Sequence, residues 1–359
     1  MADLDLGSHA LGGRFELSRG SEEPASSFGA AKSGVSRYPD SSMALPEISR
    51  RRFLVGVGGV SAAYLAAACT GGGSKPTPQS SGSIDALRRG ATELSVLSTS
   101  SPANPGKNYF GFALVTNTGE VVTGASPQVW MAKEITGKPT GPFPATWYPF
   151  APASDFNDTA PRSALPGTYA TSLDVSGLGN WIVGVSLKDG SDRFFGQAVL
   201  QVSDDKLPGA LGSKAVSTKT PVAHTLKGLR QICTRPPPDP MHYISLDQAL
   251  KNGKPTVVSF ATPLLCQSQL CGPVVDEQLL VYQKVGKAKT NFIHVEEFLP
   301  GEDFTPPPAT LQNQSPAFKK WGFQTEPWTI VIDRKGTIRG RFEGPITAPQ
   351  IEAALQPLL

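Results

Sequence analysis

The stretch TVVSFATPLLCQSQLCGP, residues 256–273, decides the fold of the C-terminal third of this chain. Its first six residues form an apolar, β-branched run, which is typical of a strand buried on both faces. Cys266 and Cys271 follow in a short loop, and apolar residues then recur at helical spacing up to Gly286. The stretch therefore predicts a strand, a cysteine loop and a helix, in that order.

The residues around this stretch alternate between helical and extended patterns. A short helix is expected at 245–250 before the first strand. Downstream, the pattern predicts strands at 290–296, 328–333 and 337–342, with helices at 315–321 and 349–358. This alternation predicts an α/β domain over residues 241–359.

Three features of this domain together resemble the thioredoxin family. They are the cysteines after the first core strand, the sequence Glu326-Pro327-Trp328 before a later strand, and the closing hairpin and helix. The resemblance covers about one third of the chain. It implies a thioredoxin-like fold in which Pro327 is cis and faces the cysteines, and a reversible dithiol/disulfide couple. The C-x4-C-G-P motif departs from the family's C-x-x-C spacing.

The two cysteines are candidate catalytic residues because a thiol reacts as its thiolate. Cys271 is expected at a helix N-terminus, where unpaired N–H groups and the helix dipole lower a thiol pKa. Cys266 matches the attacking position when counted from the strand, and Cys271 matches it when counted from the following Gly272-Pro273. Both cysteines and Pro327 are taken as catalytic, and neither cysteine has a fixed role.

Two other interpretations stay open. In the first, the pair is a structural disulfide in a non-catalytic binding lipoprotein. In the second, the chain resembles Sco-type copper-handling proteins, because soft thiolates plus an imidazole of His242 or His294 suit copper. Those proteins carry their ligand histidine further along, where this chain offers none, so no metal or other cofactor is predicted. Cys233 is a third thiol with three possible roles: redox partner, metal ligand or, preferred here, inert buried thiol.

The middle of the chain, residues 91–205, consists of short extended stretches separated by turn residues. This pattern resembles the immunoglobulin-like sandwiches of exported bacterial proteins. A Pro-rich loop is expected over 138–166. Its aromatic residues Trp147, Tyr148 and Phe150 could form a binding surface, but we prefer the interpretation that they pin the loop to its own domain. The segment contains no cysteine or histidine, so we expect no catalysis there. Residues 206–240 are predicted to form an inter-domain linker.

The N-terminal region resembles an export signal. Arg50 and Arg51 precede an apolar stretch, and this layout resembles the twin-arginine signature. Cys69 ends a sequence that resembles a bacterial lipobox, which implies lipidation. We therefore predict an extension with no folded pattern over 1–42, a signal peptide over 43–69 and a flexible linker over 70–90, with Met43 as a candidate start.

Composition agrees with this multidomain organisation. The 359 residues exceed what one hydrophobic core usually organises. The formal net charge of +3 and the scattered basic residues exclude a nucleic-acid footprint. The sequence thus predicts an extracytoplasmic thiol-disulfide oxidoreductase held at the membrane by a lipid anchor, with protein thiols or disulfides of the cell envelope as partners.

Overall fold

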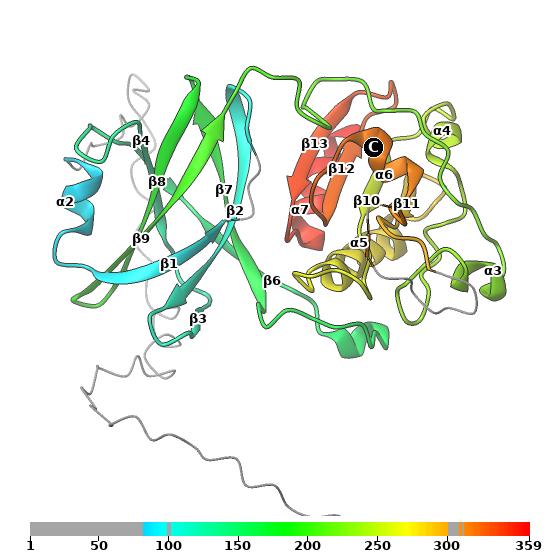
Figure 1. Cartoon of the computed structure of the whole chain (residues 1–359), viewed down its shortest axis with the longest axis horizontal. Helices are drawn as coiled ribbons and strands as arrows, with labels where there is room; N and C mark the ends of the chain where they lie inside the picture. The colour runs from blue at the N-terminus through cyan, green and yellow to red at the C-terminus, as the bar shows by residue number, and fades with distance from the viewer. Residues whose placement is uncertain (1–81, 99–101, 301–308, 311) are drawn as a thin grey trace, which may run out of the picture. The chain divides into compact units, whose positions relative to one another are not determined.

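A computed structural model describes residues 82–98, 102–300, 309–310 and 312–359 of the chain (Figure 1). Within these residues, no helix has both the length and the apolar character needed to cross a membrane. The described part contains a β-rich region followed by a four-stranded α/β region.

The β-rich region is one nine-stranded sheet in the order β5-β4-β8-β9-β1-β2-β7-β6, with β3 on β2. Strand β1 joins its two halves, because its first residues pair in parallel with β9 and the remainder pairs antiparallel with β2. The sheet-rich character expected for this region is confirmed, and the immunoglobulin-like class stays a prediction. The bounds are β1 Thr92–Ser98, β2 Gly106–Thr116, β3 Val121–Val122, β4 Gln128–Ala132, β5 Thr140–Pro144, β6 Thr146–Pro149, β7 Gly167–Val175, β8 Gly179–Asp189 and β9 Asp192–Val202.

The prediction of a Pro-rich loop over 138–166 is wrong for its first half, which contains β5 and β6. These strands end the sheet order, and an edge strand tolerates proline because one side needs no ladder hydrogen bonds. The ring of Trp147 in β6 packs 4.8 Å from that of Tyr169 in β7. The aromatic residues Trp147 and Tyr148 favour a strand, but the prolines around them favoured the prediction of a loop.

The α/β region contains a sheet in the order β11-β10-β12-β13. Strands β10 and β11 run parallel, whereas β12 and β13 are antiparallel to their neighbours. This order and the flanking helices are those of the thioredoxin-like fold that the sequence implies, and each helix and strand expected there is present. The bounds are α4 Leu246–Ala249, β10 Thr256–Phe260, α5 Cys271–Val285, β11 Asn291–Val295, α6 Pro316–Trp321, β12 Trp328–Ile332, β13 Ile338–Glu343, α7 Ala348–Leu355 and η3 Gln356–Leu358.

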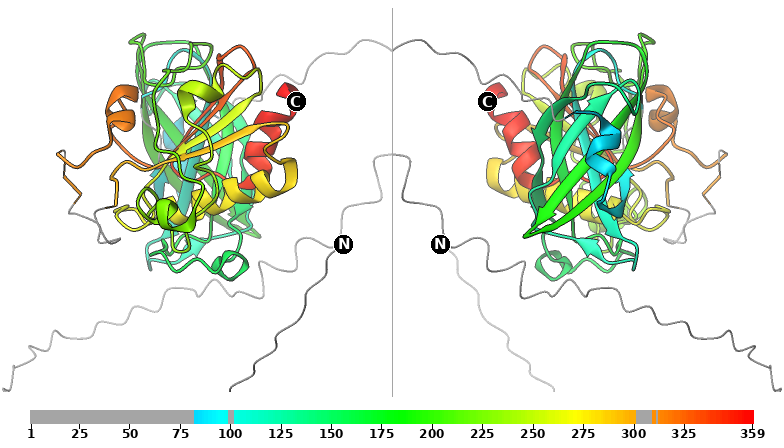
Figure 2. Two further views of the ribbon diagram at one scale, coloured as in Figure 1. Left: turned by 90° about the vertical axis from the view of Figure 1, so that its right-hand side faces the viewer. Right: turned by 90° about the vertical axis from the view of Figure 1, so that its left-hand side faces the viewer.

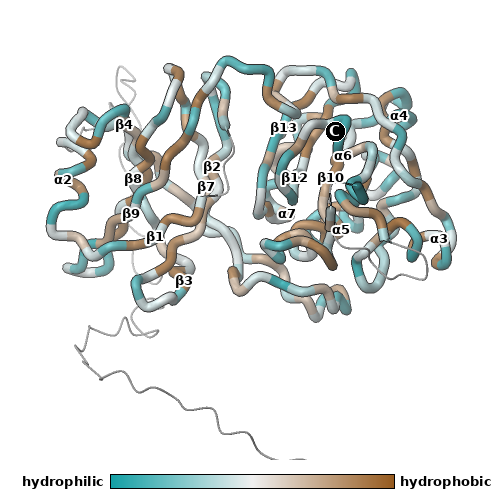
Figure 3. Tube along the Cα trace, in the orientation of Figure 1, coloured by the Kyte–Doolittle hydropathy of each residue, from teal (hydrophilic) through white to brown (hydrophobic). Residues whose placement is uncertain are grey.

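Successive residues of a strand point to opposite faces of the sheet, and the apolar residues on both faces of this sheet are covered by helices. Val257 of β10 packs in the cluster that contains residues of α5 and α7, whereas Val258 packs with α4 and α6. Figure 2 shows α5 and α7 side by side, and Figure 3 shows apolar residues along much of α5. The cysteines therefore lie where β10 leads into a helix anchored in the core.

Two segments predicted as linkers contain folded structure. Ser83 caps the helix α2 (Ile84–Arg88), and Ile84 is fully buried. Residues 206–240 include the helix α3 (Leu226–Arg230), and their backbone bonds to the α/β region, as where the Gly212 N–H donates to the Ile338 carbonyl at 2.9 Å. The second segment thus belongs to the packed structure around the cysteines.

Candidate active site

The loop between β10 and α5 places both cysteines at the start of α5. The Cys266 N–H donates to the Thr262 carbonyl at 2.9 Å, and the Gln269 N–H donates to the Cys266 carbonyl at 3.0 Å. Gln269 has φ +55°, the left-handed region that most non-glycine residues avoid. This turn accommodates the two residues that C-x4-C has beyond C-x-x-C, so that Cys271 still begins the helix.

The structure brings together the two cysteines and Glu326, a residue not predicted as part of the site. The Sγ atoms of Cys266 and Cys271 and a carboxylate oxygen of Glu326 lie within 4.8 Å of one another. Both thiols are free and buried, with Cys266 6% exposed and Cys271 fully enclosed. The bond between Glu326 and Pro327 is cis, as the family resemblance implies.

Cys266 is the more acidic thiol. The Cys271 thiol, the Ser268 hydroxyl and the backbone N–H groups of Cys271 and Leu270 donate to its sulfur, and together they lower the pKa of Cys266 to about 6 despite its burial. The Ser268 oxygen lies 3.3 Å from the sulfur. At neutral pH Cys266 is therefore mainly a thiolate, the form that attacks a disulfide.

Cys271 behaves in the opposite way, and the prediction of a lowered pKa at this helix N-terminus is wrong. Burial raises the pKa of Cys271 well above its usual value, and its hydrogen bond to Cys266 raises it further because the proton stays on Cys271. The backbone N–H of Cys271 at the helix end thus stabilises the Cys266 thiolate and not the Cys271 sulfur. The two thiols differ in protonation, which the spacing alone left open.

Glu326 holds a proton beside the thiolate. Burial raises the pKa of its carboxyl well above the usual value, and the negative charges of Cys266 and Glu297 raise it further. Its Oε2 atom is buried and has no hydrogen-bond partner in the described part of the chain. The one sequence signal was its place directly before Pro327, since that proline was already expected to face the cysteines.

A segment from the β-rich region lies against this loop. The Ser163 N–H donates to the Gln269 carbonyl at 2.9 Å, inside the cysteine motif. Farther along α5, Asp276 is 1% exposed and accepts from the buried Arg235 at 2.7 Å and from Arg162. This ion-pair group fixes α5 between the 150–166 segment and the segment that contains Cys233.

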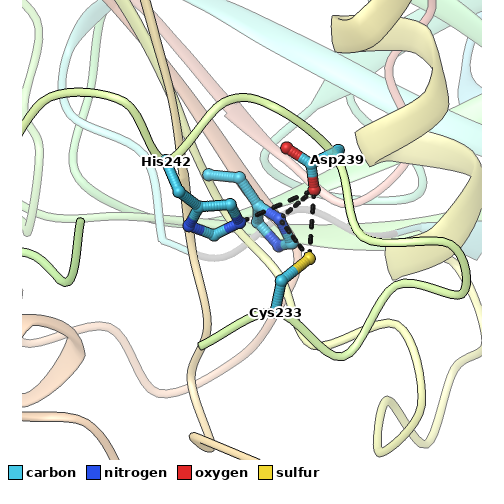
Figure 4. A group of neighbouring side chains, drawn as sticks. Cys233, Asp239 and His242 are labelled. Carbon is cyan, nitrogen blue, oxygen red and sulfur yellow. Dashed lines mark hydrogen bonds and ion pairs between the residues drawn. The ribbon is translucent and has the colours of Figure 1, made fainter. Parts of the chain in front are cut away.

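The two candidate copper ligands, His242 and His294, lie with Cys233 and not with the redox pair. His242 and His294 form a second buried group with Cys233 and Asp239, whose possible ligand atoms all lie within 4.8 Å of one another. Figure 4 shows Cys233, Asp239 and His242 pointing toward one another. Burial, Asp239 and Glu296 raise the pKa of Cys233 well above its usual value. Cys233 is thus a fully buried thiol that keeps its proton.

Solved structures match part of this chain, and they include the following two. A thiol-disulfide isomerase from Corynebacterium glutamicum is 18% identical, covers 40% of this chain and 96% of its own, and gives a TM-score of 0.28. A thioredoxin-family thiol:disulfide interchange protein from Chlorobium tepidum TLS is 21% identical, covers 41% and 99%, and gives a TM-score of 0.25. No family model and no curated protein sequence matches the chain.

Three of the residues predicted from sequence lie outside the described residues. They are Cys69, the candidate lipidation site, and Arg50 and Arg51 of the export signal. Their roles stay predictions.

Proposed function

We propose that this chain is a thiol-disulfide oxidoreductase in which Cys266 attacks and Cys271 resolves. The observation that carries the proposal is the contrast between two adjacent sulfurs, one with its pKa lowered to about 6 and the other protonated and donating to it. A structural disulfide would not need this contrast. A thiol-disulfide exchange enzyme needs this contrast, because one sulfur must attack as a thiolate while the other stays protonated until the second step.

The exchange proceeds in two balanced steps. The Cys266 thiolate attacks a substrate disulfide, which forms a Cys266–substrate disulfide and releases one substrate sulfur as a thiolate. Cys271 then loses its proton and attacks Cys266, which forms the Cys266–Cys271 disulfide and releases the second substrate sulfur. Two electrons pass from the dithiol to the substrate, and the reverse sequence oxidises a substrate dithiol.

Glu326 is the proton carrier in this scheme. Its protonated carboxyl lies beside the reacting sulfurs and gives its proton to the first substrate thiolate that leaves. Once Cys266 is in a mixed disulfide, its negative charge is gone and one cause of the raised Glu326 pKa disappears. The Glu326 carboxylate then accepts the Cys271 proton as a general base.

The test is insulin reduction together with mass spectrometry of mixed disulfides. The wild-type chain should reduce insulin, and both Cys266→Ser and Cys271→Ser should abolish the activity. Cys271→Ser should accumulate a mixed disulfide at Cys266, whereas Cys266→Ser should accumulate none. Wild-type protein as inactive as the variants, or trapping at Cys271 instead, would overturn the assignment.

We also propose that the chain acts outside the cytoplasm, held at the membrane by a lipid on Cys69. The support is the sequence alone: Arg50-Arg51 ahead of an apolar stretch, and the lipobox-like sequence from Leu65 to Cys69. Mass spectrometry of the protein from membranes should find a lipid-modified N-terminal Cys69. Recovery of unprocessed chain from the cytoplasm would contradict both parts.

A further inference from the structure

The buried group around Cys233 is separate from the redox pair and has no role in the exchange proposed above. It consists of a thiol, a carboxyl group and two imidazoles: Cys233, Asp239, His242 and His294. None of these side chains is more than 2% exposed. Burying four polar groups together is costly unless each has a partner.

Hydrogen bonds account for only part of the group. Asp239 Oδ2 lies 3.3 Å from Cys233 Sγ and 2.7 Å from His294 Nδ1. His242 Nε2 lies 3.7 Å from the same oxygen, beyond hydrogen-bond distance, and has no hydrogen-bond partner within the described residues. This imidazole therefore carries a buried, unpartnered nitrogen that points toward three other donor atoms.

We propose that Cys233, Asp239, His242 and His294 form a structural zinc site. In a tetrahedral zinc site with bonds of roughly 2.0–2.3 Å, neighbouring ligand atoms are about 3.3–3.6 Å apart. The separations here are 3.3 Å for Cys233–Asp239, 3.8 Å for Cys233–His294 and 3.7 Å for Asp239–His242. The Asp239–His294 pair, at 2.7 Å, must open by more than about half an ångström when a cation replaces its proton, and the remaining ligand atoms all lie within 4.8 Å of one another.

The charge of the group favours a divalent cation. A metal ion binds the deprotonated forms of these ligands, which are one thiolate, one carboxylate and two neutral imidazoles. These ligands carry two negative charges, so a divalent ion gives a neutral site where an uncompensated charge would be costly. A set of nitrogen, sulfur and one oxygen ligand suits zinc, whereas calcium and magnesium require mainly oxygen ligands.

The surroundings already hold the ligands in place. His294 Nε2 lies 3.0 Å from the Ala261 carbonyl, which accepts its N–H and leaves Nδ1 for the metal. Asp239 Oδ1 accepts from the Met241 N–H at 2.9 Å, so that Oδ2 is the atom turned to the group. With four protein ligands and no exposed position, the site is of the closed, structural kind.

Such a site would join the Cys233–His242 segment to the end of β11, close to the redox loop. Thr234, next to Cys233, accepts from the Leu264 N–H at 3.3 Å, two residues before Cys266. A zinc-bound Cys233 is also withheld from thiol exchange. Cys233 then forms no disulfide with Cys266 or Cys271, and thiol exchange involves only those two cysteines.

The test uses the full chain, purified reduced and without chelator. Metal analysis should find about one zinc per chain. Cobalt(II) in its place should give thiolate-to-metal charge-transfer absorption and the intense visible bands of a tetrahedral ion. Cys233→Ser and His242→Ala should weaken zinc binding by roughly 100-fold or more and remove the cobalt signal of the site. The matched control His224→Ala changes an exposed histidine and should alter neither.

A second control locates the thiolate. The double variant Cys266→Ser/Cys271→Ser should keep the cobalt absorption, because Cys233 is the only remaining thiol among the described residues. If the absorption disappears there and persists in Cys233→Ser, the metal lies at the redox pair and the proposal is wrong. Should Cys233→Ser not fold, thermal unfolding of wild type decides: zinc must raise the midpoint and chelator lower it, and no shift overturns the site.

Discussion

Replacing Cys271 with alanine should raise the pKa of Cys266, because Cys271 provides the largest of the interactions that stabilise the thiolate. The lowering from 9.0 to about 6 corresponds to roughly 4 kcal/mol. A hydrogen bond to a charged group contributes about 1.5–3 kcal/mol, so losing this one should raise the pKa by about one to two units. The thiolate fraction at pH 7 should then fall from about nine-tenths to between about a tenth and a half.

The assay is alkylation of the Cys266 peptide by iodoacetamide across a pH series, followed by mass spectrometry. The midpoint of the pH profile is compared and not the rate at one pH, because a less acidic thiolate is also a better nucleophile. Cys271→Ser is the matched control, since its hydroxyl can still donate, and its midpoint should lie below that of Cys271→Ala. A wild-type midpoint near 9, or equal midpoints in all three proteins, would refute this account of the thiolate.

Three further predictions concern the acid, the ion pair and pH. Glu326→Gln should slow release of the mixed disulfide by about 100-fold in stopped-flow exchange, with partial recovery in Glu326→Asp, because only a carboxyl can carry the Cys271 proton. Asp276→Asn should lower the free energy of unfolding in urea by about 3–5 kcal/mol, because it leaves the Arg235 charge buried without a counter-charge. The double variant Arg235→Met/Asp276→Leu should lose less of this free energy, because it buries no unpaired charge. Equal losses in the two variants would contradict this account. The pKa of Cys266 falls from 9.0 in the unfolded chain to about 6 in the folded one, so it stabilises the reduced fold fully above pH 9 and not below about pH 6. Urea unfolding of the reduced protein, compared with the oxidised protein, should therefore show the reduced form gaining stability as the pH rises from 6 to 9.

Local patterns were sufficient to predict most of the α/β region. The run before Cys266 is apolar on both faces, and a strand with two buried faces leaves that signal wherever it occurs. Strand β6 left no such signal, because Pro149 and its proline-rich neighbours indicate a loop and only pairing with β7 makes an edge strand of them. Local propensity is a weak guide where a strand depends on its partner.

The site was less predictable because its chemistry depends on distances across the fold. Cys266 and Cys271 were identified from spacing, but which of them is acidic depends on the donors that a turn with Gln269 at positive φ directs to one sulfur. Glu326 lies 60 residues from Cys266 in sequence and meets it only through the sheet. Cys233 and His294 are 61 residues apart, so the sequence could offer a metal ligand only as one of three roles for this thiol.

The two thiol environments differ in what surrounds the sulfur, and that difference separates their functions. Hydrogen-bond donors surround Cys266 and stabilise its charge, whereas Asp239 and Glu296 face Cys233 and oppose a charge there. Without a cation, Cys233 is therefore too weak a nucleophile to compete for a mixed disulfide on Cys266. With a cation, its charge is compensated by the metal and the sulfur is held by its ligand bond. In either state exchange is confined to Cys266 and Cys271, and Cys233→Ser should leave the pKa of Cys266 unchanged even where it removes the metal.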